Sequence, residues 1–220
     1  LPENPEPELV ELAARDLAHG GNRAQVLSDP AIVAAMTRDG ALPDTEARHY
    51  MCGGCMEVSV QGAASDLLFC GFINVPKLLE LRLNAGVCLH TGKTVLPQRP
   101  RTLPDYAGFE DLYAAWEQEF RDLLETTTRL IDITAATWGR LRPRYLISCQ
   151  LEDGIRRGRV MHAGGARYED AGSTPLGLPN LADSLFAIRR AVYDEGWVSA
   201  RDLLAALRTD FAGCEPLRRR

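Results

Sequence analysis

The sequence lacks any apolar run close to the roughly 20 residues that a membrane-spanning helix needs. It also lacks a long basic run, and its net charge is -5. We therefore expect neither a membrane span nor a nucleic-acid-binding surface. The acidic, proline-rich start does not resemble a secretion signal, so the sequence predicts a cytoplasmic protein. Internal repeats and low-complexity tracts are also missing, and 45% apolar with 25% charged residues is an ordinary globular mixture.

Residues typical of metal sites are scarce. The chain has four histidines, and no second Cys-x-x-Cys pair accompanies Cys52 and Cys55. A structural zinc site needs four ligands. A redox dithiol usually lies at the N-terminus of a helix, and Val58 and its neighbours do not predict a helix. We expect no bound metal, although a zinc or dithiol site at Cys52 and Cys55 stays an alternative. Without a secretion signal, the six cysteines are expected to be reduced and mostly buried.

Helical periodicity is abundant, whereas strand signals are few and short. We predict helices over residues 6–19, 28–40, 43–49, 74–84, 109–138, 143–155, 181–192 and 199–211. Residues 91–108 are turn-rich and predict a long surface loop. Asn180 and Asp183 are expected to cap a helix start. The sequence thus predicts a helix-rich α/β fold.

Residues 50–62 read as a short strand that enters a tight, glycine-containing loop. Gly53 and Gly54 allow a sharp bend and a close approach of substrate. In an extended segment, residues two apart face the same side, so Cys55 and Glu57 can address one substrate. One would exchange a hydrogen atom and the other a proton. A buried cysteine beside a solvated glutamate is the structural alternative.

Several segments, in the right order, resemble the glycyl radical enzymes of the pyruvate formate-lyase-like superfamily. GGCMEV at 53–58 resembles their Gly-Cys-x-Glu loop, and CGFINVPKLLEL at 70–81 is similar to their GFINLPKxLEL helix. Further matching segments are 28–50, 86–93, 164–168, 180–188 and 203–217. Together they span about residues 25 to 217. Any one of them alone would be weak, but the ordered set is specific.

The resemblance implies a fold and a mechanism. The family fold is a ten-stranded α/β barrel in two five-stranded halves, and this chain resembles the second half. By the resemblance, Cys55 becomes the thiyl radical that takes hydrogen from substrate carbon, and Glu57 is the general base. A glycyl radical on a separate segment, installed by a radical-SAM activating enzyme, draws hydrogen from Cys55. The family works anaerobically and commonly forms homodimers; substrate-binding residues are not assigned.

The loop favours one branch of the superfamily. Pyruvate formate-lyase has two adjacent cysteines, whereas Gly54 precedes Cys55 here. The Cys-x-Glu form resembles dehydratases and C–O, C–N or C–S lyases that act on small hydroxylated compounds. Arylacetate decarboxylases and formate acetyltransferase-like enzymes are the alternatives. Val58 stands where the dehydratases most often have proline, and Cys52 where an aliphatic residue is usual, so the substrate class stays open.

The family's glycyl motif, Arg-Val-Ser/Ala-Gly-Tyr, does not occur in the sequence, and residues 159–162 do not match it. The first half-barrel is missing too. We therefore expect residues 1–220 to be a partial barrel domain without the glycyl radical domain, inactive alone. The chain would be a fragment, part of a split enzyme, or, in another class, a non-catalytic remnant or docking subunit. Exposed barrel edges predict that this piece aggregates.

A few conspicuous residues outside the loop are expected to be structural. Arg167 and Tyr168 could contact substrate or the glycyl loop, but an ion pair at the edge of the core is the simpler explanation. A lone histidine such as His162 is more often structural than functional. Trp116 and Trp138, on the longest predicted helix, are expected in the core. The cysteines at 70, 88, 149 and 214 receive no role.

Overall fold

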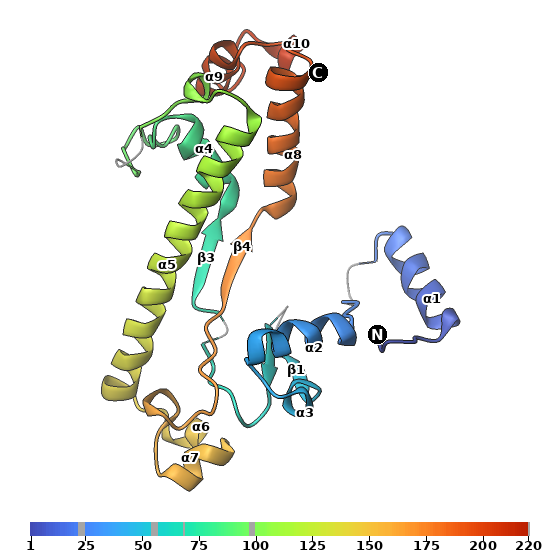
Figure 1. Ribbon diagram of the computed structural model, residues 1–220, viewed down its shortest axis with the longest axis vertical. Coiled ribbons are helices and arrows are strands. Elements are labelled where there is room, and N and C mark those ends of the chain that lie inside the picture. Colours follow the sequence, from blue (N-terminus) through green and yellow to red (C-terminus); the bar gives the residue numbers. More distant parts are fainter. Residues whose placement is uncertain (22–24, 54–56, 68, 97–99, 220) are drawn as a thin grey trace. The chain divides into compact units, whose positions relative to one another are not determined.

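The computed structural model describes residues 1–21, 25–53, 57–67, 69–96 and 100–219. The chain divides into two compact units (Figure 1). Unit 1 comprises Leu1–Leu68 and Gly139–Asp170, and unit 2 comprises Phe69–Trp138 and Ala171–Arg220. Within the described ranges, no helix combines the length and the apolar character that crossing a membrane requires.

The described residues of unit 1 form short helices and an antiparallel strand pair. Its helices are α1 (Pro7–Ala18), α2 (Asp29–Thr37), α3 (Asp44–Ala47), α6 (Tyr145–Ser148) and α7 (Glu152–Arg157). Strand β1 (Tyr50–Gly53) pairs with β2 (Glu57–Val60). A small apolar cluster is formed by Leu151, Met161 and Ala166.

Unit 2 contains two strand–helix segments and the longest helix. Strand β3 (Gly71–Asn74) leads into α4 (Val75–Leu83), and β4 (Ser173–Leu176) leads into α8 (Leu178–Ile188). β3 and β4 pair in parallel (Figure 1), with Gly71 opposite Ser173 and Asn74 opposite Leu176. Further α-helices are α5 (Phe109–Leu141), whose last three residues belong to unit 1, α9 (Ala200–Arg208) and α10 (Glu215–Arg218). A π-helical segment, Arg189–Asp194, continues α8.

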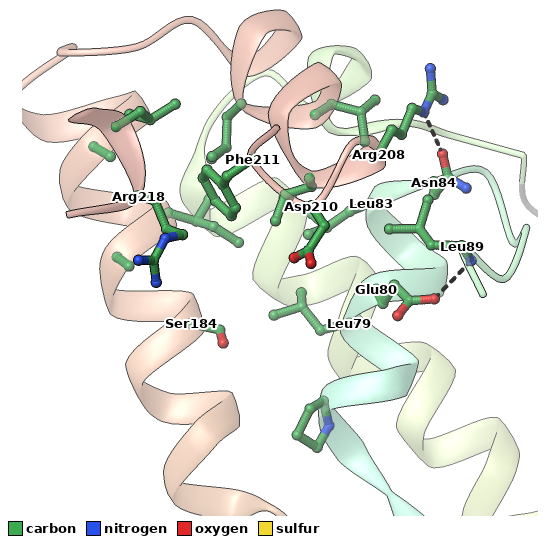
Figure 2. Close-up of a pocket in the computed structure, with 18 of the residues that line it drawn as sticks. Leu79, Glu80, Leu83, Asn84, Leu89, Ser184, Arg208, Asp210, Phe211 and Arg218 are labelled. Atoms are coloured by element: carbon green, nitrogen blue, oxygen red, sulfur yellow. Dashed lines mark hydrogen bonds between the residues drawn. The ribbon is translucent and has the colours of Figure 1, made fainter. Parts of the chain in front are cut away.

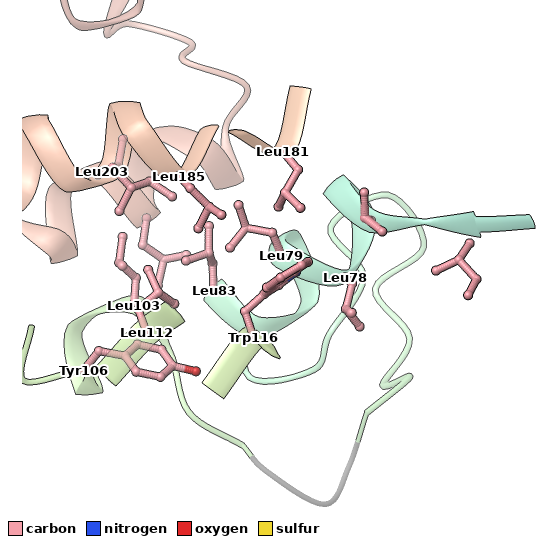
Figure 3. Close-up of a cluster of buried hydrophobic side chains, with 14 residues drawn as sticks. Leu78, Leu79, Leu83, Leu103, Tyr106, Leu112, Trp116, Leu181, Leu185 and Leu203 are labelled. Atoms are coloured by element: carbon pink, nitrogen blue, oxygen red, sulfur yellow. The ribbon is translucent and has the colours of Figure 1, made fainter. Parts of the chain in front are cut away.

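One hydrophobic core holds unit 2 together (Figure 3). It gathers the inner faces of α4, α5, α8 and α9 around Leu79, Leu112, Leu185 and Leu204. Leu112 is completely buried. The buried Arg82 donates to the hydroxyl of Tyr106, a member of this core, at 2.8 Å and pairs with Glu119 at 3.4 Å. Burial of apolar surface is the main favourable contribution to folding in such a core.

Two of the helices begin with the side-chain cap that the sequence predicts. The side chain of Asn74 accepts a hydrogen bond from the amide of Lys77 at 2.9 Å, and Ser199 accepts one from Asp202 at 3.1 Å. Each satisfies an amide in the first helical turn that has no partner within the helix. Predictions of helix position based on these caps are confirmed.

Several predictions are wrong in detail. Trp138 was expected in the core, but it is half-buried and does not belong to the core cluster of unit 2. Residues 143–155 form two helices, α6 and α7, because Leu151 is buried in an extended conformation and the next amide donates to Gly62 at 3.0 Å. Asn180 and Asp183 do not cap α8 but lie inside it, since the left-handed Gly177 starts the helix earlier.

The segment 91–108 is also not entirely a surface loop. It contains a 3-10 helix, Leu103–Asp105, and Leu103 and Tyr106 are buried in the core of unit 2. Prolines and glycines indicate where a chain turns, but they do not indicate which of the intervening apolar side chains are buried.

Candidate functional site

The described parts of the predicted catalytic loop, residues 50–53 and 57–62, include both strands of the pair in unit 1. Tyr50 is opposite Val60, and Gly53 is opposite Glu57. Residues 54–56, which include Cys55, connect these two strands in sequence and lie outside the described residues. The structure therefore places Glu57 but does not test whether Cys55 shares its face, and the catalytic pair stays a prediction.

Glu57 is half-buried on a strand face that also carries Ser59, because side chains two apart point the same way. The hydroxyl of Ser59 donates to the carboxylate of Asp170 at 2.6 Å. Burial raises the pKa of Asp170, and the Ser59 hydrogen bond opposes that rise. A carboxyl group that holds its proton more tightly than usual thus lies against the strand that carries the predicted base.

Two further contacts hold this region in place. The hydroxyl of Tyr50 donates to Asp29 of α2, and this hydrogen bond, with burial, raises the pKa of Tyr50 to about 12. On the other side, the backbone oxygen of Asp170 lies 3.5 Å from the hydroxyl of Ser65, which in turn accepts from the Asp170 amide at 2.8 Å. Strand β1 and the end of β2 are therefore connected to elements distant in sequence.

Arg167 is the centre of an ion-pair network in unit 1. Its guanidinium donates to Asp153 at 3.0 Å, to Glu46 at 2.9 Å and to Glu152 at 3.2 Å. The Asp153 side chain is 3% exposed, and Arg167 holds the pKa of that carboxyl below its ordinary value. The network joins α3, α7 and the segment that carries Arg167, which supports the predicted structural role.

Tyr168 continues the same segment. Its amide donates to Ala63 at 3.1 Å and its carbonyl accepts from Ser65 at 2.8 Å, and a parallel bridge joins Ala64 and Tyr168. The glycine at position 165 permits this path, because a Cβ atom there would lie 2.4 Å from the carbonyl oxygen of Arg159. These contacts are consistent with a structural role for Tyr168.

His162 is buried between two acidic side chains. Its Nε2 lies 3.0 Å from Asp66, and its Nδ1 lies 3.7 Å from Glu169. Asp66 also pairs with Arg144. The predicted structural role of His162 is thus supported, while the contributions of Asp66 and Asp170 were missed, because no local sequence pattern singles out an isolated aspartate.

The cysteines differ from the prediction. Those described are free thiols, but Cys52 and Cys149 are exposed, Cys70 and Cys214 are half-buried, and only Cys88 among them is buried. The expectation that most are buried is wrong, since small side chains on loops and strand ends do not have to enter a core. No group of three or more potential metal ligands occurs in the described part of the chain. The zinc and dithiol alternatives depend on Cys55 and are not tested.

Unit 2 has a pocket of about 960 Å³ between α4, α8 and α9 (Figure 2). Its walls are mainly apolar, and Figure 2 shows the carboxylate of Asp210 directed toward Leu79. Asp210 and Phe211 both have left-handed backbone conformations, with φ of 50° and 58°, at the end of α9. The pocket belongs to unit 2, whereas Glu57 belongs to unit 1.

Comparisons with known proteins agree on the family. A model of the pyruvate formate lyase-like family matches residues 3–220. The chain is 27% identical, over 98% of its length and 26% of the relative's, to (2S)-3-sulfopropanediol dehydratase from Klebsiella oxytoca. It is 29% identical, over 78% of its length and 22% of the relative's, to trans-4-hydroxy-L-proline dehydratase from Clostridioides difficile.

A solved structure shows the same fold. The glycerol-bound B12-independent glycerol dehydratase from Clostridium butyricum superposes with a TM-score of 0.84 at 23% identity, over 98% of this chain and 27% of that one. The chain thus spans about a quarter of the length of these relatives. The predicted fold class, a helix-rich part of a pyruvate formate-lyase-type α/β barrel with few short strands, is confirmed. The chain belongs to the pyruvate formate lyase-like family.

Proposed function

We propose that the chain carries the catalytic loop of a glycyl radical dehydratase or related C–O, C–N or C–S lyase that acts on a small hydroxylated compound. Cys55 is the hydrogen-atom donor and acceptor, and Glu57 is the general base. The observation that carries the proposal is the strand pair: Gly53 lies opposite Glu57, and the three residues connecting them include Cys55. Relatives that are dehydratases support it.

The chemistry of the pair follows from the two residue types. The Cys55 sulfur takes a hydrogen atom from a substrate carbon and later returns it. Glu57 removes the proton of the adjacent hydroxyl group, and the added electron density on the carbon radical helps a neighbouring substituent to leave. The half-buried position of Glu57 limits access of water to the base.

The unpaired electron would come from a glycyl radical outside residues 1–220, installed by a radical-SAM activating enzyme. In this proposal residues 1–220 are one portion of the barrel domain, with the loop at 50–62, and the enzyme acts in an anaerobic cytoplasm as a homodimer.

The test uses the intact protein, activated anaerobically with a radical-SAM activating enzyme. The glycyl radical is measured by electron paramagnetic resonance, and products from small diols, hydroxyproline and arylacetates are measured by mass spectrometry. Cys55→Ala should keep the radical signal but abolish turnover. Glu57→Gln should lower kcat about 10²- to 10⁴-fold, because a general base is lost.

Cys52→Ala is the matched control, since it removes an exposed thiol three residues from Cys55 and should leave turnover unchanged. Full turnover by Cys55→Ala would disprove the assignment. Product from arylacetates alone would favour the decarboxylase alternative, and an intact protein that never acquires a radical would favour the non-catalytic remnant.

A further inference from the structure

The strand that carries Glu57 is short. β2 has four residues and pairs with β1, whose four residues end at Gly53. A two-stranded ribbon of this size is only marginally stable by itself and needs contacts with other parts of the chain to keep its position. The position of a base on such a strand therefore depends on the contacts that hold the strand.

Ser59 and Asp170 form one such contact. The Ser59 hydroxyl donates to the Asp170 carboxylate at 2.6 Å, although the two residues are 111 positions apart in the sequence. Both residues are half-buried, and limited exposure to water strengthens a hydrogen bond of this kind. Ser59 follows Glu57 by two residues, so both side chains belong to the same face of the strand. The contact thus holds the face of β2 that carries the predicted base.

Asp170 is itself held by its backbone. Its amide donates to the hydroxyl of Ser65 at 2.8 Å, and Ser65 is 4% exposed. The amide of Ser65 donates in turn to the carbonyl of Tyr168 at 2.8 Å. Because Ser65 binds the chain at both 168 and 170, the Asp170 carboxylate reaches Ser59 from a fixed stretch of backbone.

The same stretch of backbone is connected to the ion-pair network of unit 1. Arg167, three residues before Asp170, donates to Asp153 of α7 at 3.0 Å and to Glu46 of α3 at 2.9 Å. The amide of Arg167 also donates to Ala63 at 2.7 Å. A guanidinium group that binds several carboxylates has little freedom to move. Contacts therefore connect α3 and α7, through residues 167–170, to β2.

We propose that Asp170 is a positioning residue for the general base: it acts through Ser59 to fix β2, and with it Glu57. The inference rests on the proposed function, in which Glu57 removes the proton of a substrate hydroxyl group. A base must lie within hydrogen-bond distance of that proton, about 2.6 to 3.2 Å between heavy atoms, so a small displacement of β2 slows proton transfer. Asp170 needs no contact with the substrate for this role.

The first experiment does not require turnover. Hydrogen exchange of the intact, unactivated protein is followed in peptides that cover residues 57–60. Asp170→Ala and Ser59→Ala should each speed exchange there about tenfold, as expected for the loss of one hydrogen bond to a charged group. Asp170→Asn should keep most of the protection, because its side-chain oxygen also accepts from Ser59. Glu169→Ala is the matched control, since it removes the neighbouring carboxylate, which pairs with His162, and should leave this exchange unchanged.

The second experiment uses the intact protein after anaerobic activation, with turnover expressed per glycyl radical. Asp170→Ala should lower kcat about 10- to 100-fold with little change in KM, because a misplacement of about 1 Å can cost that much in rate. Asp170→Asn should restore most of kcat. In a Glu57→Gln background, Asp170→Ala should have no further effect, since no base remains to be positioned. A residue with only a structural role would lower kcat equally in both backgrounds.

Two results would overturn the positioning role. One is unchanged exchange of residues 57–60 in both Asp170→Ala and Ser59→Ala. The other is an equal loss of kcat from Asp170→Ala with and without Glu57→Gln. Full turnover by Glu57→Gln alone would instead disprove the assigned base, and the positioning role with it, so a failure of the proposed function is distinguishable from a failure of this inference.

Discussion

Among the described residues, unit 2 buries 14 core side chains in one cluster, whereas the cluster of unit 1 holds three. Unit 1 instead relies on charged contacts, with Arg167 donating to carboxylates from two helices. Apolar burial is non-directional and does not depend on protonation, whereas ion pairs depend on position and on pH. The unit that carries the predicted catalytic loop is thus the one held by position-sensitive contacts.

The largest expected effect is in the core of unit 2. Leu112→Ala should destabilise this unit by about 3 to 4 kcal/mol, because it removes a completely buried side chain and leaves a cavity. Hydrogen exchange of the intact protein, followed peptide by peptide, measures the loss within unit 2. The matched control is Leu130→Ala on the same helix, which is 59% exposed and should cost less than about 0.5 kcal/mol. Equal effects of the two changes would contradict the assigned core.

The next effect concerns the ion-pair network of unit 1. Asp153→Ala should destabilise unit 1 by about 2 to 3 kcal/mol, because it removes the buried partner of Arg167, which keeps Glu46 and Glu152. Hydrogen exchange in unit 1 is the measurement. Asp44→Ala, which breaks an exposed pair with Arg48, is the control and should have almost no effect. Protection lost equally in both variants would show that burial of the pair does not matter.

A smaller effect should appear on acidification. The pKa of Asp153 is lowered by Arg167 in the folded state, so its contribution to stability is present above the ordinary aspartate pKa of about 3.9 and is lost as pH falls through the lowered value. Unit 1 should therefore lose protection below about pH 4. Limited proteolysis across this range checks it. Asp153→Ala should weaken the pH dependence of proteolysis in unit 1. Unit 2 should keep its own pH dependence, because Arg101 likewise lowers the pKa of Asp111.

The smallest effect is at a helix start in unit 2. Ser199→Ala should cost about 1 kcal/mol, because the amide of Asp202 loses its side-chain acceptor. Exchange of the first amides of α9 measures it. Ser199→Asn, which can also accept this hydrogen bond, should restore most of the protection. Failure of the asparagine to do so would mean that the cap is not the cause.

Contacts within a few residues could be predicted from the sequence. Asn74 and Ser199 cap helices where polar side chains precede apolar periodicity, and the long helix around Trp116 follows from its 3.6-residue repeat. The position of strand β1 was predicted too, because glycines end it. These features depend on interactions between residues that are close in the sequence.

Contacts across the sequence could not be predicted. The Arg167–Glu46 pair joins residues 121 positions apart, and Ser59 and Asp170 are 111 apart. A charged residue has many potential partners in the sequence, and only the folded backbone selects among them. For the same reason, the break between α6 and α7 was missed, since it follows from an amide that donates to Gly62.

The sequence by itself determined the family, because an ordered set of short motifs specifies it. The same motifs predict the catalytic pair, which stays a prediction. Only the tertiary structure decided what lies against the strand that carries Glu57 and which of the described cysteines lies beside a lysine. Burial and electrostatics depend on which distant segments meet, and spacing along the chain does not encode that directly. Cys88 shows this most clearly: the sequence assigned it no role, and its distinguishing feature is the ammonium of Lys77 beside its sulfur.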